Sequence, residues 1–511
     1  MKKFINLIMS RMVIVGVLLF IQLFILFMSI WRLGEYFVYL YIAFNIISIL
    51  AVWYILNKKD NPSYKLAWVI PILLFPVFGG LFYIFVGGDK VSKTFRRKFN
   101  LSVDESIKYL PENKEIEAEI SQEKQSIARQ SQYITRVAGY PIYKNTQTQY
   151  LSPGETFFDK LIEELKKAEY FIFMEYFIID EGYMWETILT VLEEKAKQGV
   201  DVRMMYDDAG TIQTLPYKYH ETLKKKGIKV AVFNEIKAQL SLKFNNRDHR
   251  KITVIDGYRG FSGGINLADE YINKIVHFGH WKDAAIYLEG EAVLSLTSMF
   301  LQVWSYSTGE PVDLRKYTPK LYAKGTFESD GYVQPYGDSP LDDEPVGENV
   351  YLNMINRATD YVYINTPYLI VDNELVTALT LAARSGVDIR IVTPHIPDKW
   401  YVHILTRAYY PQLIEAGVKI YEYTPGFIHS KTFVADDEVG VVGTINLDYR
   451  SLYLHFECGV FLYKTQSIKD LKEDFLETLE ICLPVTLEEC NKVKWYVKFV
   501  RSIIRVMAPL M

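Results

Sequence analysis

The sequence predicts an α/β protein with two mixed-sheet domains related by pseudo-twofold symmetry and preceded by N-terminal transmembrane helices. Three observations support this fold class. The chain has 511 residues, which exceeds one typical domain of roughly 100–200 residues. Apolar residues make up 50% of it, and their excess is concentrated at the N-terminus. The remaining chain repeats itself, and each repeat alternates strand-like and helix-like segments.

The predicted membrane region, residues 1–88, contains three apolar stretches. Residues 12–31 carry no charge over 20 positions, the length that a helix needs to cross about 30 Å of hydrocarbon. Residues 37–56 are similar. A cleaved signal peptide is the alternative for the first stretch, but its apolar run is too long and no small-residue cleavage site follows it. We therefore expect two transmembrane helices.

The third stretch, residues 66–88, is interrupted by Pro71, Pro76, Gly79 and Gly80, so it is either a third span or a re-entrant or interfacial hairpin. Basic residues favour the cytoplasmic side of a membrane. They precede the first span, follow the second and follow the third stretch: Lys2, Lys3 and Arg11; Lys58, Lys59 and Lys65; Lys90, Lys93, Arg96, Arg97 and Lys98. A re-entrant segment places all three clusters in the cytoplasm, whereas a full span places only two there. The sequence thus predicts a multi-pass protein of the cell membrane with cytoplasmic catalytic domains.

Two charged segments flank the α/β part. Residues 89–136 are rich in Glu and Lys and helical in character, and we interpret them as a charged linker with a solvated face. In residues 491–511, basic side chains recur at helical spacing among apolar ones, which predicts a basic amphipathic helix. This helix either packs on the core or lies at the membrane interface against anionic lipid.

Charge and cysteine content exclude some classes of function. The formal net charge of -4 gives no overall basic footprint, so nucleic acid is not an expected partner. The chain has three cysteines and no CxxC pair, which excludes a disulfide framework and gives no metal-binding cysteine pair.

Short segments recur in the two halves of the remaining chain. The residues VDVR at 200–203 correspond to VDIR at 387–390, and GIKV at 227–230 corresponds to GVKI at 417–420. Each GIKV-like segment follows a helix-like one, so both halves predict a sheet covered by helices. The predicted domains span residues 137–323 and 326–490.

A motif of reactive side chains is also duplicated. Each half contains His-x-Lys-x4-Asp with an Asn 17 positions after the His. Duplication by itself indicates a common origin of the two halves and does not establish a function for the motif. The two sets are His249, Lys251, Asp256 and Asn266, and His429, Lys431, Asp436 and Asn446.

The segment HRKITVIDGYRGFSGGIN, which begins at His249, is typical of a β-hairpin because a β-branched run precedes a turn signal. His249 and Lys251 lie two apart on an extended segment and therefore point to the same face. A two-residue turn at residues 257–258 would place Asn266 opposite His249 and Gly264 opposite Lys251.

The same pairing is expected in the second half, where HSKTFVADDEVGVVGTIN begins at His429. A turn at residues 437–438 would place Asn446 opposite His429 and Thr444 opposite Lys431. In both hairpins His, Lys and Asn would then converge on one face, beside small residues that leave room for a ligand.

This set of side chains suits a phosphodiester. Lys supplies a cation, Asn and His donate hydrogen bonds, and together they can bind an oxyanion. His can also attack phosphorus or donate a proton to a leaving alkoxide. Two halves related by a pseudo-twofold axis would place their histidines on opposite sides of one phosphate, as in-line displacement requires.

Four acidic residues are candidates for supporting roles. Asp256 and Asp436 follow their histidines by seven positions, at the hairpin corner, where a turn-stabilising role is favoured over contact with substrate. Asp283 and Glu457 each begin or enter an apolar strand after the motif and are expected to orient the imidazoles. Their offsets from the His of their own half are 34 and 28 residues, so the first half needs a longer loop. The remaining histidines match no shared motif position and are interpreted as surface or structural residues: His220, His277, His280, His395, His403 and His455.

The duplicated motif resembles that of the phospholipase D superfamily, H-x-K-x4-D followed by a Gly/Ser-rich stretch and Asn. Both copies fit, although the usual Gly-Ser before Asn is Gly263-Gly264 in one half and Gly443-Thr444 in the other. The resemblance implies two domains that share one active site, a phosphohistidine intermediate and no metal. By family precedent His249 would be the nucleophile and His429 the general acid and base, which the symmetry of the sequence cannot decide.

More narrowly, the chain resembles the bacterial cardiolipin synthases of this superfamily over nearly its whole length. The resemblance rests on the N-terminal apolar stretches, on AWVIPILLFPVFGGLFYIFVGG, FIFMEYFIIDEG and VYINTPYLIVDNEL, and on the basic C-terminus that ends in APLM. It implies phosphatidyl transfer between two phosphatidylglycerol molecules, giving cardiolipin and glycerol, without a nucleotide cofactor. A hydrolytic phospholipase D, a phosphatidylserine synthase and a catalytically inactive membrane scaffold remain alternatives. The oligomeric state is not indicated.

Overall fold

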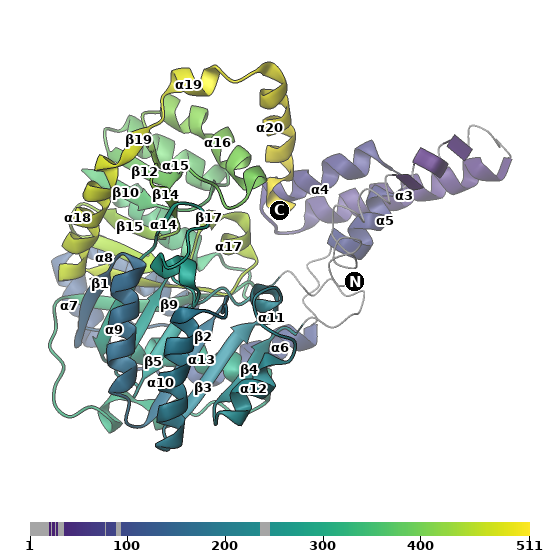
Figure 1. The fold of residues 1–511 in the computed structure, drawn as a ribbon. Coiled ribbons are helices and arrows are strands. Elements are labelled where there is room, and N and C mark those ends of the chain that lie inside the picture. Colours follow the sequence, from purple (N-terminus) through teal and green to yellow (C-terminus); the bar gives the residue numbers. More distant parts are fainter. Residues whose placement is uncertain are drawn as a thin grey trace. The chain divides into compact units, whose positions relative to one another are not determined.

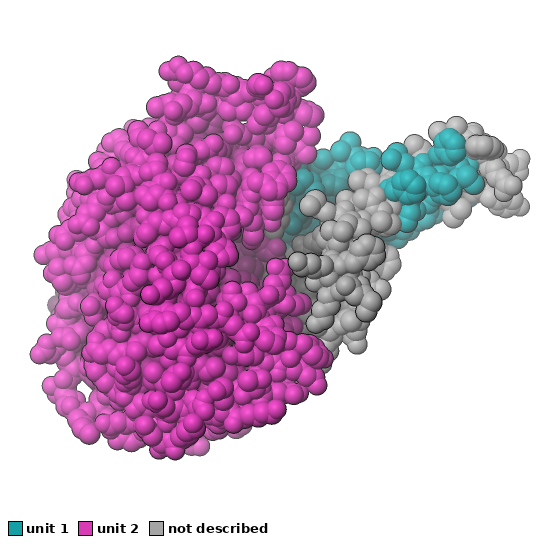
Figure 2. Space-filling view, viewed as in Figure 1, with its two compact units in different colours: residues 1–90, 506–511 teal, residues 91–505 magenta. Residues whose placement is uncertain are grey.

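The computed structural model describes residues 35–76, 78–87, 93–235 and 246–510, together with a few positions between residues 20 and 28. The chain forms two compact units (Figure 2). The first unit comprises residues 1–90 and 506–511, and the second comprises residues 91–505.

The first unit is helical. It contains α3 (Glu35–Asn57), α4 (Pro62–Leu74), the short α5 (Gly79–Phe82), the π-helical turn η1 (Tyr83–Gly87) and the 3-10 turn η5 (Ala508–Leu510). Asn61 caps α4 by accepting a hydrogen bond from the backbone of Ser63, with Pro62 in the first turn, where its missing N–H costs nothing. A Cβ on Gly80 would lie 2.7 Å from the Ser48 hydroxyl oxygen, so only glycine allows this approach of α5 to α3. The third apolar stretch is therefore an interrupted pair of helices.

None of the helices among the described residues combines the length and the apolarity needed to cross a membrane. The predicted crossing by residues 12–31 lies largely outside the described residues, and the predicted crossing by residues 37–56 coincides with α3. Neither crossing is confirmed.

The second unit contains two mixed sheets covered by helices (Figure 1), and seven strands of each follow the same order. The first sheet has the order β1-β8-β6-β5-β2-β3-β4. The second has the order β9-β18-β16-β15-β10-β12-β13, with β19 added at its edge. In each, three parallel strands are followed by an antiparallel hairpin, which confirms the predicted pair of α/β folds.

The strands of the first sheet are β1 (Thr146–Leu151), β2 (Phe171–Tyr176), β3 (Asp201–Asp207), β4 (Lys229–Phe233), β5 (Ile252–Ile255), β6 (Arg259–Gly263) and β8 (Ala285–Gly290). Those of the second are β9 (Tyr332–Asp338), β10 (Tyr361–Asn365), β12 (Asp388–Pro394), β13 (Lys419–Tyr423), β15 (Thr432–Ala435), β16 (Val439–Gly443), β18 (Glu457–Tyr463) and β19 (Cys482–Pro484).

Short two-stranded pairs complete the strand inventory: β7 (His280–Lys282) with β14 (Gly426–Ile428), and β11 (Leu369–Ile370) with β17 (Leu447–Asp448). The β7–β14 pair is parallel and joins the two halves.

Helices cover both faces of the first sheet. Successive residues of a strand point to opposite faces: Ile172 and Met174 of β2 lie in the apolar core that includes α9 and α10, whereas Phe173 stacks on Phe300 of α13 at 4.7 Å between ring centroids. Helix α13 is buried along most of its length, because it packs on β5 and β6 of the first half and on β9 of the second.

The longer helices of the two halves are α9 (Gly154–Lys166), α10 (Tyr183–Lys197), α13 (Val293–Thr308), α14 (Val346–Arg357), α15 (Asn373–Arg384), α16 (Trp400–Glu415) and α18 (Gln466–Glu480). The short ones are α11 (Asp208–Thr211), α12 (Tyr219–Lys225), α17 (Tyr449–Tyr453), α19 (Leu487–Asn491) and the 3-10 turns η2 (Asp269–Ile272), η3 (Leu314–Tyr317) and η4 (Pro319–Leu321).

The charged segment before the first sheet is part of the folded second unit. It forms α6 (Lys93–Ile107), α7 (Lys114–Glu123) and α8 (Gln125–Ala138). The buried ring of Phe99 lies 4.7 Å from that of Phe456, and Ile127 and Ile134 of α8 are also buried. A solvated linker would bury none of these side chains, so this interpretation of the segment is wrong.

Both predicted hairpins form, but their turns differ from the prediction. In the first, Ile252 pairs with Ser262 and Ile255 with Arg259, which leaves a three-residue loop at residues 256–258. The second hairpin has the same loop length at residues 436–438. The predicted two-residue turns and the cross-strand partners derived from them are therefore wrong by one residue. Asp256 and Gly257 both have positive φ, 50° and 73°, which gives the longer turn its shape.

The C-terminal segment forms α20 (Trp495–Met507), and none of its residues is buried. Arg505 of this helix nevertheless contacts α16, by a hydrogen bond to Gln412 at 2.7 Å and by its position 4.4 Å from the centroid of the Tyr409 ring, so the helix lies against the second half without burying its apolar side chains.

Candidate active site

Each motif histidine is held by backbone from the other half. The His249 N–H donates to the Phe456 carbonyl at 2.9 Å, and the His429 N–H donates to the Lys282 carbonyl at 2.7 Å. Phe456 directly precedes Glu457, and Lys282 directly precedes Asp283. The two contacts are thus equivalent under the pseudo-twofold relationship, and each brings a carboxylate of one half beside a histidine of the other.

The carboxylates bind the Nδ1 atoms of these histidines. His249 Nδ1 lies 2.9 and 3.0 Å from the two oxygens of Glu457, and His429 Nδ1 lies 2.6 Å from Asp283 Oδ2. The sequence indicated these two acids as partners of the imidazoles without assigning either to a particular histidine, and in the structure each lies beside the histidine of the other half. Because Nδ1 is engaged, Nε2 is the ring nitrogen left for chemistry.

The two carboxylates have different surroundings. Glu457 also accepts hydrogen bonds from the Thr444 hydroxyl at 2.5 Å and the Ser451 hydroxyl at 2.6 Å. Asp283 accepts one from the Ala284 N–H at 2.8 Å. Gly264, which occupies the position of Thr444 in the first half, approaches Asp283 so closely that a Cβ would lie 2.1 Å from Oδ1. The absence of a side chain at Gly264 thus makes room for Asp283, whereas sequence analysis assigned that space to a ligand.

Burial shifts the titration of both histidines. Together with the neighbouring lysines, it lowers the pKa of His249 to about 3 and that of His429 to about 4. Burial alone would raise the pKa of Glu457, but the adjacent His249 imidazole holds that pKa below its usual value. At neutral pH the free enzyme therefore has two neutral imidazoles beside ionised carboxylates.

The motif lysines are buried beside the histidines. Lys251 Nζ donates to the carbonyl of His249 at 2.6 Å, and Lys431 Nζ makes the equivalent bond to the carbonyl of His429. Burial lowers the pKa of Lys251 to about 8 and that of Lys431 to about 7. An anionic ligand would restore the charged form of both.

The two motif asparagines differ in their contacts. Asn266 accepts a hydrogen bond from the Ile178 N–H at 3.0 Å and donates to the Tyr271 hydroxyl at 2.7 Å, so a ligand would meet an amide that is already fixed. Asn446 is buried, and its Oδ1 has no hydrogen-bond partner among the described residues.

Asp256 and Asp436 lie away from the histidines, at the far ends of β5 and β15. Seven residues of extended chain span about 23 Å. The Asp256 carboxylate accepts hydrogen bonds from the backbone N–H groups of residues 169–171 and pairs with Arg259 at 2.7 Å. Asp436 accepts the equivalent bonds from residues 359–361. Each carboxylate thus joins its hairpin to the start of the neighbouring parallel strand.

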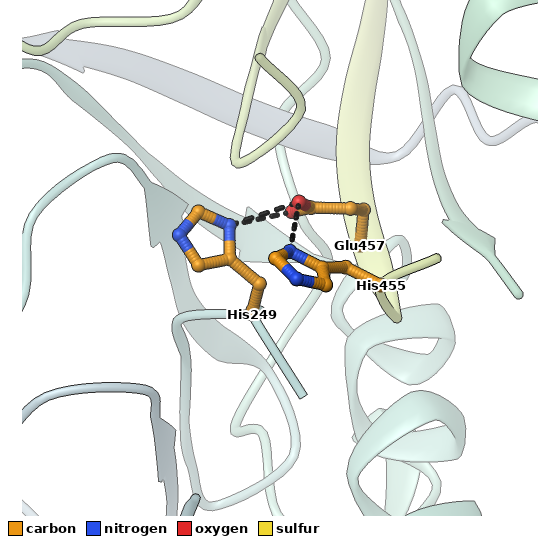
Figure 3. Close-up of side chains that lie close together, drawn as sticks. All are labelled: His249, His455 and Glu457. Carbon is orange, nitrogen blue, oxygen red and sulfur yellow. Dashed lines mark hydrogen bonds and ion pairs between the residues drawn. The ribbon is translucent and has the colours of Figure 1, made fainter. Parts of the chain in front are cut away.

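Aromatic side chains surround the two histidines. The ring of Phe177 lies 5.1 Å from that of His249, and Tyr271 lies 5.5 Å from His429. Sequence analysis also missed His455, whose ring centroid lies 5.4 Å from that of His249 and whose Nδ1 lies 3.7 Å from Glu457 Oε1 (Figure 3). A signal was available, because His455 precedes Glu457 by two positions, just as Trp281 precedes Asp283.

Two groups of side chains among the described residues bring possible metal-binding atoms within 4.8 Å of one another. One consists of His249, His455 and Glu457, and the other of Glu348, Asp372 and Glu374. In the first, His249 Nδ1 is already hydrogen-bonded to Glu457. In the second, the Tyr453 hydroxyl contacts Glu348 at 2.6 Å and Asp372 at 2.7 Å. Hydrogen bonds within the chain thus account for both groups.

The fold and the paired His-Lys motifs define a phospholipase D-type α/β protein with one composite site. Residues 161–304 and 351–479, more than half of the chain, match the family described as "Cardiolipin synthase, PLD-like domain". Residues 46–88 match "Phospholipase_D-nuclease N-terminal". The chain therefore belongs to the cardiolipin synthase family with phospholipase D-like domains.

Known proteins resemble the chain over most of its length. A Streptococcus mutans protein without a stated function is 46% identical over 90% of this chain and 99% of its own length. The cardiolipin synthase of Halalkalibacterium halodurans is 36% identical over 94% of this chain and 95% of its own length. The crystal structure of phosphatidylserine synthase from Haemophilus influenzae covers 75% of this chain and 98% of that chain, with a TM-score of 0.56. At 14% identity this last similarity concerns the fold alone.

Proposed function

We propose that the protein is a cardiolipin synthase that transfers a phosphatidyl group from one phosphatidylglycerol to another, releasing glycerol. The observation that carries the proposal is the pair of complete, mutually dependent half-sites. Both histidines have a buried carboxylate at Nδ1, and both have a buried lysine two positions away. The names of the relatives, cardiolipin synthases at 34–37% identity, support the same reaction.

The first step forms a phosphohistidine. Nε2 of His249 attacks the phosphorus of phosphatidylglycerol, and the bond from phosphorus to the glycerol oxygen breaks. His429, protonated in the presence of the anionic substrate, donates its Nε2 proton to that oxygen, and glycerol leaves. The low pKa of unliganded His249 supports this role, because only a neutral imidazole has a lone pair at Nε2.

The second step reverses these roles around a new alcohol. His429 takes the proton from the terminal hydroxyl of a second phosphatidylglycerol, whose oxygen attacks phosphorus as the bond to His249 breaks. Cardiolipin leaves, and both histidines return to their starting protonation. One phosphodiester replaces another, so the reaction is close to reversible and consumes no nucleotide.

The lysines and asparagines bind the phosphate in this proposal. Lys251 and Lys431 gain their full charge when an anion enters and stabilise the negative oxygens of the transition state. The unpartnered Oδ1 of Asn446 can accept a hydrogen bond from a substrate hydroxyl, while Asn266 offers a fixed amide. Asp283 and Glu457 orient the histidines and stabilise their charged forms. We assign Asp256 and Asp436 to holding the hairpins, on the basis of their backbone contacts.

We also propose that the protein works at the membrane surface, with α20 against anionic lipid. Three apolar side chains of this helix are largely exposed: Trp495 at 79%, Phe499 at 61% and Ile503 at 50%. Lys498 is exposed on the same helix, and Lys494 is exposed directly before it. An apolar face flanked by lysines suits the boundary between headgroups and acyl chains. The multi-pass arrangement with cytoplasmic catalytic domains is part of this proposal, and cysteine-accessibility labelling from each side of the membrane tests it.

The deciding experiment supplies the purified full chain, reconstituted in vesicles, with phosphatidylglycerol alone. Equal amounts of cardiolipin and glycerol, measured by mass spectrometry, are the expected result. Phosphatidic acid in place of cardiolipin would identify a hydrolase. Turnover only after addition of serine and a cytidine-activated lipid would identify a phosphatidylserine synthase. Absence of turnover with every donor would favour a scaffold.

A further inference from the structure

Besides the carboxylates and the Gly264–Thr444 pair, the two half-sites differ at one more position, directly beside the motif histidines. Trp281 and His455 occupy equivalent places, each two residues before the carboxylate that orients a histidine. The Trp281 ring lies 5.3 Å from that of His429, and the His455 ring lies 5.4 Å from that of His249. The interplanar angles are also similar, 49° and 41°. The first half thus has an indole where the second half has an imidazole.

The His455 imidazole lies close to the carboxylate of Glu457, whereas the Trp281 indole makes no corresponding contact with Asp283 among the described residues. His455 Nδ1 is buried and faces Glu457 Oε1 at 3.7 Å (Figure 3), and it has no hydrogen-bond partner among the described residues. Trp281 Nε1 is also buried, and it has no hydrogen-bond partner, Asp283 included, among the described residues. A shift of about 0.8 Å would bring His455 Nδ1 to hydrogen-bonding distance from the carboxylate.

Glu457 has room for this bond. An ionised carboxylate offers about four acceptor positions. His249 Nδ1 contacts both oxygens, at 2.9 Å from Oε1 and 3.0 Å from Oε2, while the Thr444 hydroxyl binds Oε2 and the Ser451 hydroxyl binds Oε1. Because Oε2 can hold His249, a second position on Oε1, the oxygen that lies 3.7 Å from His455 Nδ1, can accept the bond from His455.

We infer that His455 is a positioning residue, which donates Nδ1–H to Glu457 and so limits how strongly this carboxylate stabilises the charged ring of phosphorylated His249. The inference rests on the proposed function, because it concerns the phosphohistidine. In the second step the P–N bond of His249 breaks while the new P–O bond forms, and the alcohol proton moves to His429. A cationic His249 ring is a good leaving group. Excessive stabilisation of that cation by Glu457 would keep the phosphorylated form and slow its breakdown.

The direction of the effect follows from the charges around His249. The groups that face it are Glu457, Lys251 and His455. His455 itself faces Glu457, Arg450 and Asp448. Without the His455 N–H, Glu457 stabilises the positively charged ring of phosphorylated His249 more strongly. Phosphorylation of His249 is then not slowed, whereas cleavage of the P–N bond in the second step is slower. A purely structural defect would slow both steps.

The experiment follows glycerol release and cardiolipin formation by rapid quench with the full chain in phosphatidylglycerol vesicles. The variant His455→Phe keeps an aromatic ring and removes the N–H. We expect it to show an initial burst of glycerol release and accumulation of phosphoenzyme. Cardiolipin formation should be about tenfold slower, because loss of a hydrogen bond to a charged group changes a rate by about that factor or more. His249 must be neutral to attack, so the acid limb of kcat/KM should move to higher pH. His455→Asn places an amide N–H where Nδ1 lies and should restore both properties.

Trp281→Phe is the matched control, because it removes the unpartnered N–H at the equivalent position and should change neither the burst nor the pH profile. His455→Leu is a second variant without a donor, for use if the Phe variant has a lowered melting temperature. If a folded variant without a donor has the burst amplitude and pH profile of wild type, the role of His455 is overturned while the proposed function stands. Equal slowing of both steps would have the same consequence. Failure of the wild-type chain to release glycerol would overturn the proposed function, and the inference with it.

Discussion

Glu457 Oε1 lies 2.9 Å from His249 Nδ1, although 208 residues separate these side chains in the sequence. His429 and Asp283 form the reciprocal pair across 146 residues. Each half therefore supplies a histidine that it cannot orient by itself. In the proposed reaction the two halves therefore act as one catalytic unit, and loss of one carboxylate should be detected at the histidine of the other half.

Substitution of Glu457 by Gln should abolish most activity and leave the fold intact. The amide keeps the shape of the side chain but cannot stabilise a charged imidazole, and it favours the wrong tautomer of His249. We expect kcat to fall by about 10³-fold, in keeping with the loss of the carboxylate partner of other catalytic histidines. Steady-state cardiolipin formation measures this. Glu480→Gln, on an exposed position of α18, should retain full activity. Activity within tenfold of wild type in the Glu457 variant would contradict the proposed orientation.

The two histidines should be distinguishable by covalent labelling. With phosphate-labelled phosphatidylglycerol, His249→Asn should incorporate no label, because Asn offers no nucleophile. His429→Asn should incorporate label slowly and retain it, because the proton acceptor for the second alcohol is missing. Acid-quenched protein resolved by electrophoresis gives the measurement. If label persists in His249→Asn and disappears in His429→Asn, His429 is the nucleophile and His249 is the general acid and base.

Stability should rise between about pH 4 and 6.5. Burial lowers the pKa of His429 to about 4, whereas a histidine in the unfolded chain has its ordinary pKa of about 6.5. In this window the unfolded chain binds more protons than the folded chain, so the free energy of unfolding increases with pH. Replacing His429 by Asn removes one such group and should reduce the slope by about 1.4 kcal/mol per pH unit.

Denaturant titrations of wild type and His429→Asn at several pH values test this slope. His220→Asn, outside the site, serves as the control. Identical slopes in wild type and His429→Asn would show that His429 is not buried in its neutral form.

Asp256 should matter for folding more than for chemistry. Its carboxylate accepts three backbone hydrogen bonds and pairs with Arg259. Asp256→Ala leaves these buried donors without acceptors, which costs about 1–3 kcal/mol for each unsatisfied group. We expect a clear drop in melting temperature, with kcat per folded molecule retained. Asp159→Ala, exposed on α9, is the comparison. A large loss of kcat without loss of stability would return Asp256 to the catalytic set.

The exposed face of α20 should enter the lipid. With the full chain in phosphatidylglycerol vesicles that contain brominated acyl chains, Trp495 should be quenched because bromine quenches indole fluorescence on close approach. The quenched fraction should fall in Trp495→Phe and stay unchanged in Trp400→Phe, which replaces another exposed tryptophan, 67% exposed, on α16. Equal quenching in wild type and Trp495→Phe would place this face in water.

Local patterns predicted much of the fold. Recurrence of VDVR and GIKV predicted two equivalent halves, and the structure confirms them as two sheets of identical strand order. The hairpins were also predicted, but not their turn length. The Asp-Gly pair at residues 256–257 is a common two-residue turn signal. Its Asp instead adopts positive φ and binds the backbone of residues 169–171, which no local pattern encodes.

The charged helices α6–α8 show the same limit. Their composition is typical of a solvated segment, and only the packed structure places Phe99 against Phe456. In the candidate site, Thr444 is an example of a contact that local sequence patterns did not predict. Its sequence position suggested a small residue beside a ligand, whereas its hydroxyl donates to Glu457.

The sequence by itself determined the duplicated fold and the family, and it predicted which side chains are reactive, because motif spacing and repeats can be recognised without the structure. Only the tertiary structure decided which carboxylate serves which histidine. Asp283 and Glu457 each reach the opposite half because strand β7 and the segment before β18 pair with backbone across the pseudo-twofold interface. That pairing joins residues far apart in the chain, and it also sets His455 beside His249, where the sequence offered only one more unmatched histidine.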